Sequence, residues 1–295
     1  MPLILGEHMP RIRRVPVYQI NIAANPHDEG IYPRLLTRAS QIIAALRGSD
    51  YGKITAPVAV DGRPNLYRGY IRIWTNIDAD GRWYDIESGE ELDPEIKAQI
   101  VIPDNAKPNF RGYDYVFDSR THRLYFEAKN DLDSTVSPQT VLKLFRIIFA
   151  PEALGDGWPE VSITMVPEAS VVSRILALPR LDTLFISVVR PNPDGADDDA
   201  AQRVWGKLDQ LHAHKVEVLM KRANEAERLT VTADYREMAE VAAENGLVVG
   251  KGRNPDGTKT EISTVARPKR INVEMDRGQN FLARLLSAVP GLGGN

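Results

Sequence analysis

The sequence contains no cysteine among its 295 residues, which excludes disulfides, thiolate zinc sites and cysteine nucleophiles. Long apolar runs are also missing, because no stretch approaches the ~20 apolar residues that a membrane helix requires. The short apolar start, "PLIL", meets charged residues too early for a signal peptide. An excess of basic charge is lacking as well, since the formal net charge is −3. These absences predict a cytoplasmic protein without membrane insertion, in which only a local basic face remains possible.

The apolar residues that are present, 43% of the chain, follow strand and helix periods in turn. "VPVYQINIAA" alternates as a strand does, and "PRLLTRASQIIAAL" repeats its apolar residues as a helix does. "SPQTVLKLFRIIFA" predicts a helix with Ser137 as its N-cap and Pro138 in its first turn. A strand, a helix and a strand follow up to residue 190. The pattern predicts an α/β protein of the α+β kind, with a mixed, largely antiparallel sheet, helices packed on one face and a smaller C-terminal α/β region.

Composition changes along the chain and suggests three parts. Residues 10–190 carry the strand and helix patterns of a globular α/β domain. Residues 191–250 are helical in pattern and richer in acids than in bases, so we expect a hinge or a partner-binding region there. Residues 251–290 reverse the balance toward bases and predict a basic β-hairpin followed by a C-terminal helix.

The stretch "YDYVFDSRTHRLYFEAKN" predicts two strands joined by a turn at residues 119–122. With this turn, Asp118 lies opposite Arg123 and Asp114 lies opposite Glu127. Alternation along the strands then places Tyr115, Phe117, Leu124 and Phe126 on a buried face. The opposite face receives the charged residues, among them Asp114, Glu127 and Lys129. Two opposed carboxylates repel each other, at a cost of ~0.2–1 kcal/mol in a sheet.

A divalent cation between Asp114 and Glu127 would turn this repulsion into attraction, since hard carboxylate oxygens suit Mg²⁺. Lys129 would then steady the attacking water or the charge that develops on a phosphate. The spacing resembles the PD-(D/E)xK nuclease superfamily, with Tyr113-Asp114 in place of Pro-Asp and Glu127-Ala128-Lys129 as the tripeptide. The resemblance implies a further active-site residue on the next helix, which carries Gln139 and Lys143. The alternative is an ordinary hairpin whose outer face is charged and solvated.

The order of elements from Val15 to Val273 carries a second resemblance. The aromatic hairpin, the helix that begins at "SPQTV", the strand–helix–strand run and the final "ENGLVVGKGRNPDGTKTEISTVARPKRINV" are similar to phage-exclusion proteins of the RexA kind. They are also similar to the KwaB subunit of Kiwa defence systems and to an uncharacterised bacterial family found near defence genes. The resemblance implies a homodimer that binds double-stranded DNA and works with a membrane or effector protein. It assigns no catalytic residue.

Basic residues near the C-terminus agree with this expectation. Six of them fall within one predicted β-hairpin and its extension, namely Lys251, Arg253, Lys259, Arg267, Lys269 and Arg270. A two-stranded ribbon fits the major groove of DNA, and lysine and arginine supply most phosphate contacts. The alternative is that these charges protect the edge of a sheet from pairing with another chain.

The sequence therefore leaves three functions open. The first is a DNA-binding protein of anti-phage defence that has no sequence preference and no cofactor. The second is a magnesium-dependent nuclease that uses Asp114, Glu127 and Lys129, with the two carboxylates as metal ligands. The third is a non-catalytic interaction subunit whose charged hairpin binds another protein.

Overall fold

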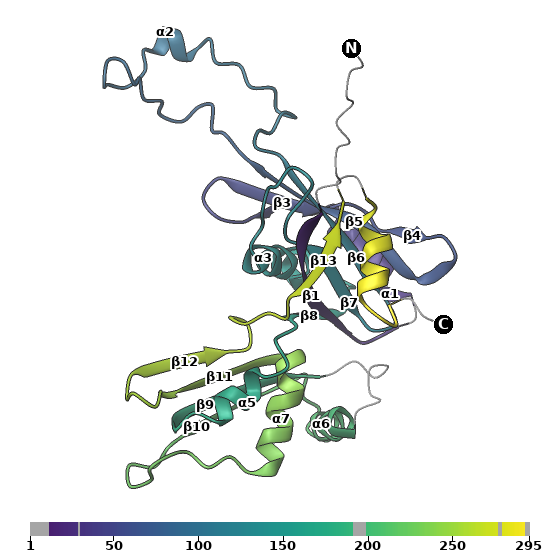
Figure 1. Cartoon of the computed structure of the whole chain (residues 1–295). Helices are drawn as coiled ribbons and strands as arrows, with labels where there is room; N and C mark the ends of the chain where they lie inside the picture. Colours follow the sequence, from purple (N-terminus) through teal and green to yellow (C-terminus); the bar gives the residue numbers. More distant parts are fainter. Residues whose placement is uncertain (1–11, 29, 191–198, 277–278, 293–295) are drawn as a thin grey trace, which may run out of the picture.

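The structure is a computed structural model that describes residues 12–28, 30–190, 199–276 and 279–292. The chain forms two sheets that lie one above the other in Figure 1. Every strand pairing in the described part of the chain is antiparallel. The fold is therefore a mixed α+β fold with a largely antiparallel sheet, as the sequence predicts. None of the helices in the described ranges combines the length and apolar character needed to cross a membrane.

The larger sheet has nine strands, and its central path runs β13-β1-β7-β6-β5-β3-β2. Two further strands join it, β4 beside β5 and β8 beside β1. The long strand β1 pairs with three partners in succession, β13 at its start, β7 in its middle and β8 at its end. The strands are β1 (Arg13–Asn25), β2 (Ala44–Ala45), β3 (Asp50–Ile54), β4 (Val58–Val60), β5 (Arg63–Thr75), β6 (Arg111–Asp118), β7 (Arg123–Glu127), β8 (Glu160–Met165) and β13 (Ile271–Met275).

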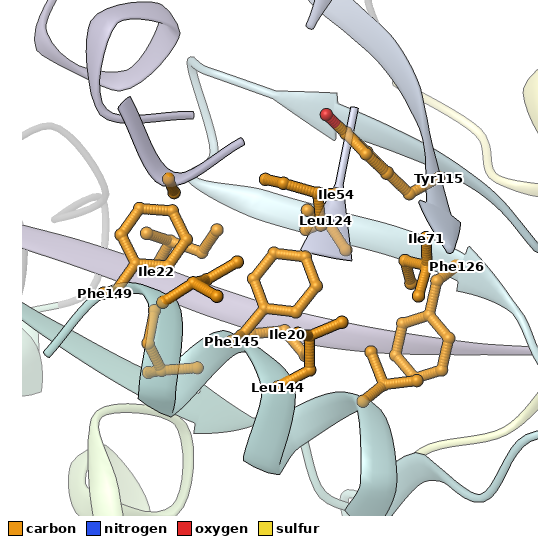
Figure 2. Close-up of a cluster of buried hydrophobic side chains, with 14 of the residues drawn as sticks. Ile20, Ile22, Ile54, Ile71, Tyr115, Leu124, Phe126, Leu144, Phe145 and Phe149 are labelled. Carbon is orange, nitrogen blue, oxygen red and sulfur yellow. The ribbon is translucent and has the colours of Figure 1, made fainter. Parts of the chain in front are cut away.

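The main hydrophobic core lies between the large sheet and the helices on one of its faces. Helix α3 (Pro138–Ile148) turns Leu144 and Phe145 toward the sheet, where they meet Ile20, Leu124 and other apolar side chains (Figure 2). As predicted, the Ser137 side chain accepts a hydrogen bond from the backbone N–H of Thr140 and caps this helix. Helix α1 (Ile31–Ala39) joins the same core, and the short helix α4 (Pro151–Leu154) follows α3.

The opposite face of the large sheet is partly covered by helix α8 (Phe281–Ala288). Its buried Phe281 and Leu285 pack with Val116 and Tyr125 of the aromatic hairpin. The alternative interpretation of this hairpin, with a charged and solvated outer face, is wrong over this part of the sheet. The segment between β5 and β6 contains the short helix α2 (Pro94–Lys97) and projects away from the sheet in Figure 1.

The smaller sheet has four strands in the order β10-β9-β11-β12. These are β9 (Arg180–Val189), β10 (Lys215–Lys221), β11 (Gly246–Arg253) and β12 (Lys259–Ser263). Helices α5 (Val171–Leu176) and α7 (Ala233–Glu244) contact its strands, and α6 (Asp199–Gln210) packs beside α7 (Figure 1). Apolar side chains of these helices form a second core with one face of the sheet.

The strand pairing divides the chain differently from the sequence-based division at residues 190 and 250. Strand β9 precedes residue 190 but pairs on both edges with strands of the small sheet, β10 and β11. Strand β13, expected in the C-terminal basic part, returns instead to β1 of the large sheet. The sheet to which β9 and β13 each belong is determined by pairing partners far away in the chain, and a change of composition does not reveal such partners. The acidic residues 191–198 lie outside the described residues.

Candidate functional site

The hairpin formed by β6 and β7 has the register that the sequence predicts. Asp118 pairs with Arg123, and Tyr115 pairs with Phe126. The next position brings Asp114 opposite Glu127, and the backbone N–H of Asp114 donates a 3.0 Å hydrogen bond to Oε1 of Glu127. The two carboxylates expected to act together are therefore neighbours on one face of the large sheet.

Burial changes the acidity of both carboxylates. Burial raises the pKa of Glu127 to about 8; the nearby Asp114 charge adds to this rise, while the hydrogen bond from the Asp114 N–H opposes it. Burial also raises the pKa of Asp114, with a contribution from Asp131, and three arginines oppose that rise. A strongly perturbed carboxyl group beside charged partners is a frequent property of functional sites.

The other residues of the predicted nuclease site are held elsewhere. Lys129 Nζ lies 2.9 Å from Oδ1 of Asp133, four residues further along the chain. Gln139 donates to the carbonyl of Val265, and Lys143 donates to the carbonyl of Leu46. Both belong to α3, which packs on the opposite face of the sheet from Asp114 and Glu127. They therefore do not join the carboxylate pair as the resemblance implies.

The carboxylate pair meets part of what a magnesium ion needs. Mg²⁺ in proteins is commonly held by one or two carboxylates and otherwise by water and substrate phosphate. Asp114 and the second oxygen of Glu127 are suitable ligands, since the Asp114 side chain has no hydrogen bond within the described part of the chain. The described residues contain no group of three or more histidine, cysteine, aspartate or glutamate side chains that could hold a metal ion. A metal here would thus depend on these two carboxylates alone.

Strand β5 adds residues that the sequence analysis did not single out. Tyr70 pairs with Asp114, and Arg68 and Arg72 pair with the neighbouring Val116 and Gly112, so the three β5 side chains share the face of the carboxylates. Neither arginine has a hydrogen bond or ion pair within the described ranges. The alternating sequence "RGYIR" between residues 68 and 72 was the available signal. It becomes informative only when β5 is known to pair with β6.

The structure separates the six C-terminal basic residues into two groups. Lys251, Arg253 and Lys259 lie on the hairpin of β11 and β12. The other three follow β12, on the connection that returns to the large sheet, where the backbone of Lys269 donates to Val166 and that of Arg267 accepts from Glu168. The prediction of one continuous ribbon for all six is wrong, because β12 ends at Ser263 and β13 pairs with β1.

The first group lies on the face of the small sheet that its helices do not cover. Val248 belongs to the core with α5 and α7, and a Cβ on Gly250 would approach Ile175 of α5 to 2.3 Å. The alternate residues Lys251 and Arg253 therefore point to the opposite face. Lys221, Thr183, Lys251 and Glu261 lie side by side there, one on each strand.

The basic face of the small sheet comprises Lys221, Lys251, Arg253 and Lys259. Lys251 forms a 2.9 Å ion pair with Glu261, and both side chains stay more than half exposed. Arg253 donates to the carbonyl of Gly257. Neither Lys221 nor Lys259 has an ion pair within the described part of the chain. Glu261 and Glu217 are acids of the same face, and Glu217 forms an ion pair with Lys215. Cations still outnumber these two acids, so the face keeps a local positive charge in a protein with a net charge of −3.

The fold and these two charged faces define a two-sheet α+β protein with separate candidate sites on its large and small sheets. The chain belongs to the DUF4747 family, described as a domain of unknown function, whose family model matches residues 13–289. No curated protein matches the chain.

Proposed function

We propose that this protein binds double-stranded DNA without sequence preference through the basic face of the small sheet. The observation that carries the proposal is the position of Lys221 and Lys251 on either side of Thr183, on a sheet face that none of the described helices covers. Neighbouring strands are ~4.8 Å apart, so these two lysines start roughly 10 Å from each other. Arg253 and Lys259 extend the charge along the β11–β12 hairpin.

These side chains suit a phosphate backbone better than a particular base sequence. Lysine and arginine that contact phosphates fix the orientation of a protein on DNA and carry no sequence information. Each neutralised phosphate releases counterions, so the binding constant falls as the salt concentration rises. The logarithm of the binding constant falls against the logarithm of the salt concentration with a slope of about −0.9 per neutralised phosphate. Arg267, Lys269 and Arg270 form a second exposed basic group on the connection to β13 and supply further contacts.

The resemblance to RexA and KwaB proteins supports a wider proposal. It supports a cytoplasmic homodimer that acts in phage exclusion together with a membrane or effector protein. In this proposal the basic face holds the DNA, and the helices of the small sheet are left for protein partners. No cofactor takes part in the binding itself.

A salt titration of duplex binding tests the basic face. The double variant Lys221→Glu with Lys251→Glu should weaken binding and reduce the salt slope by about two, because each lysine would otherwise neutralise one phosphate. Lys269→Glu with Arg270→Glu tests the connection in the same way. Lys207→Glu with Arg236→Glu is the matched control, since it makes the same change in charge at exposed positions on α6 and α7. The proposal is contradicted if the affinity of the wild-type protein for duplex DNA does not change with salt concentration. It is also contradicted if Lys221→Glu with Lys251→Glu weakens binding no more than the control variant does.

A magnesium-dependent nuclease is the second candidate, and the contact between Asp114 and Glu127 favours it. Supercoiled plasmid incubated with Mg²⁺ tests it, with relaxed or linear DNA as the expected products. Asp114→Asn and Glu127→Gln should each lower the cleavage rate by at least about tenfold, because even the outer-shell partners of a metal contribute that much. Lys129→Ala should have a smaller effect, because Lys129 is paired with Asp133. Intact plasmid with the wild-type protein would exclude this activity on duplex DNA.

A further inference from the structure

The part of the large sheet that the described helices leave uncovered presents two exposed aromatic rings next to cations. Tyr70 is 42% exposed and Phe110 is 56% exposed, both high values for large apolar side chains. The guanidinium carbon of Arg72 lies 4.5 Å from the centre of the Tyr70 ring and 5.2 Å from that of Phe110. The three side chains thus form one group, with the cation in contact with both rings.

The backbone is adapted to this arrangement at Gly112. A Cβ at this position would lie 2.9 Å from Nη1 of Arg72 and 3.5 Å from the ring of Phe110. Any larger residue would push Arg72 away from the rings, so glycine leaves the space in which the arginine lies across β6. Arg72 lacks a hydrogen bond within the described ranges, and its outward N–H groups remain available to a ligand.

Further cations surround this group on the same face. Arg68 lies two residues before Tyr70 on β5, and Lys53 of β3 pairs with Arg72. Neither side chain has an ion pair within the described part of the chain. Asp114 is an acid of the same face and pairs with Tyr70 across the two strands. The surface therefore combines flat apolar rings with cations that have no ion pair within the described residues.

We propose that this aromatic platform, formed by Lys53, Arg68, Tyr70, Arg72 and Phe110, binds single-stranded nucleic acid. Unpaired bases stack on exposed aromatic rings regardless of sequence, and arginine and lysine contact the phosphates between them. Bases inside a duplex are already stacked on one another and cannot reach the rings. The platform is thus a second site, separate from the basic face of the small sheet, with a different form of nucleic acid as its ligand. The proposal holds whether or not Asp114 and Glu127 bind a metal.

Fluorescence anisotropy with labelled twelve-nucleotide oligo(dT), oligo(U) and a duplex of equal length tests the platform. Tyr70→Ala and Phe110→Ala should each weaken single-strand binding about tenfold, the usual effect of removing one stacking ring. Duplex binding should change less than twofold. Tyr84→Ala is the matched control, because Tyr84 is 67% exposed on the segment between β5 and β6 and has no ring or cation contact with the platform within the described residues. Binding of either oligo(dT) or oligo(U) supports the proposal.

The basic-face variant Lys221→Glu with Lys251→Glu separates this inference from the proposed function. It should weaken duplex binding and leave single-strand binding unchanged. Ultraviolet cross-linking of the unsubstituted protein to oligo(dT), followed by mass spectrometry, should find adducts on peptides that contain Tyr70 or Phe110. Absence of single-strand binding, unchanged affinity in both aromatic variants, or adducts confined to the small sheet would each overturn the proposal.

Discussion

At the scale of single residues, Glu127 has the most unusual environment in the hairpin. Its side chain is only 4% exposed, and it receives one backbone hydrogen bond while lying beside a second carboxyl group. Burial raises its pKa to about 8, far above the ordinary value of 4.5. Ionised Glu127 therefore destabilises the folded chain, and the protein favours its protonated form near neutral pH.

This environment predicts a pH-dependent effect of Glu127→Gln. Between pH 4.5 and about 8 the unfolded chain has released the Glu127 proton while the folded chain still holds it. Stability from this residue is thus complete below pH 4.5 and is lost as the pH rises toward 8. Glutamine keeps a hydrogen-bond acceptor and cannot ionise. The variant should therefore melt several degrees above the wild type at pH 9 and within about one degree of it at pH 4.

Thermal melts from pH 4 to pH 9 measure this difference. The exposed substitution Glu152→Gln is the control and should follow the wild-type curve throughout. Parallel curves for wild type and Glu127→Gln would show that the carboxyl group does not titrate as its burial implies.

At the scale of helices and strands, the sequence correctly predicted the features that depend on neighbouring residues. It did not predict those that depend on residues far away in the chain. The turn at 119–122, the register of the hairpin and the cap at Ser137 all depend on residues within a few positions, and the structure confirms each of them. The helix predicted for residues 33–46 is wrong at its end. Helix α1 stops at Ala39, and Ala44–Ala45 pairs with β3 as the edge strand β2. A short edge strand has too few residues to show a period.

The candidate site residues were likewise predicted only where they are close in the sequence. The neighbouring positions of Asp114 and Glu127 followed from one hairpin and were predicted correctly. Tyr70 and Arg72 were missed because β5 precedes β6 by a long segment that contains α2, and only the pairing of these strands brings them together. Coverage of the outer face by α8 depends on contacts between the two ends of the chain. No local pattern reports such contacts.

At the scale of the whole molecule, the two sheets are joined by polar contacts near the hairpin turn. The Asn21 side chain of β1 donates to the carbonyl of Glu244 and, at 3.0 Å, to Oδ1 of Asn245. Arg123 of β7 forms an ion pair with Glu244 at the end of α7. These residues line a cavity of about 420 Å³ between the two sheets. His214, which precedes β10, also contacts Asn25 of β1 and Glu160 of β8. Each sheet has its own apolar core, so these polar contacts and the two chain crossings determine how firmly the sheets are held together.

The ion pair between the sheets should therefore matter more than an exposed one. The Arg123 side chain is only 19% exposed, and its Nη1 atom is buried without a hydrogen-bond partner among the described residues. Glu244→Ala would leave this guanidinium without its carboxylate, and we expect a decrease of roughly 1–3 kcal/mol in the free energy of unfolding. Glu237→Ala is the matched control, because it breaks a more exposed ion pair, which joins Glu237 of α7 to Arg203 of α6 and does not connect the two sheets. Such a pair contributes about 0–1 kcal/mol.

Hydrogen exchange identifies where the stability decreases. In Glu244→Ala, amides of residues 121–123 and 244–246 should exchange faster, while the cores of both sheets keep their protection until global unfolding. In Glu237→Ala, protection at these residues should match that of the wild type. If Glu244→Ala and Glu237→Ala lower stability equally and leave the turn at 119–122 protected, Arg123 and Glu244 do not hold the sheets together. The contacts of His214 with Asn25 and Glu160 and the Pro167–Pro268 bridge would then carry that role.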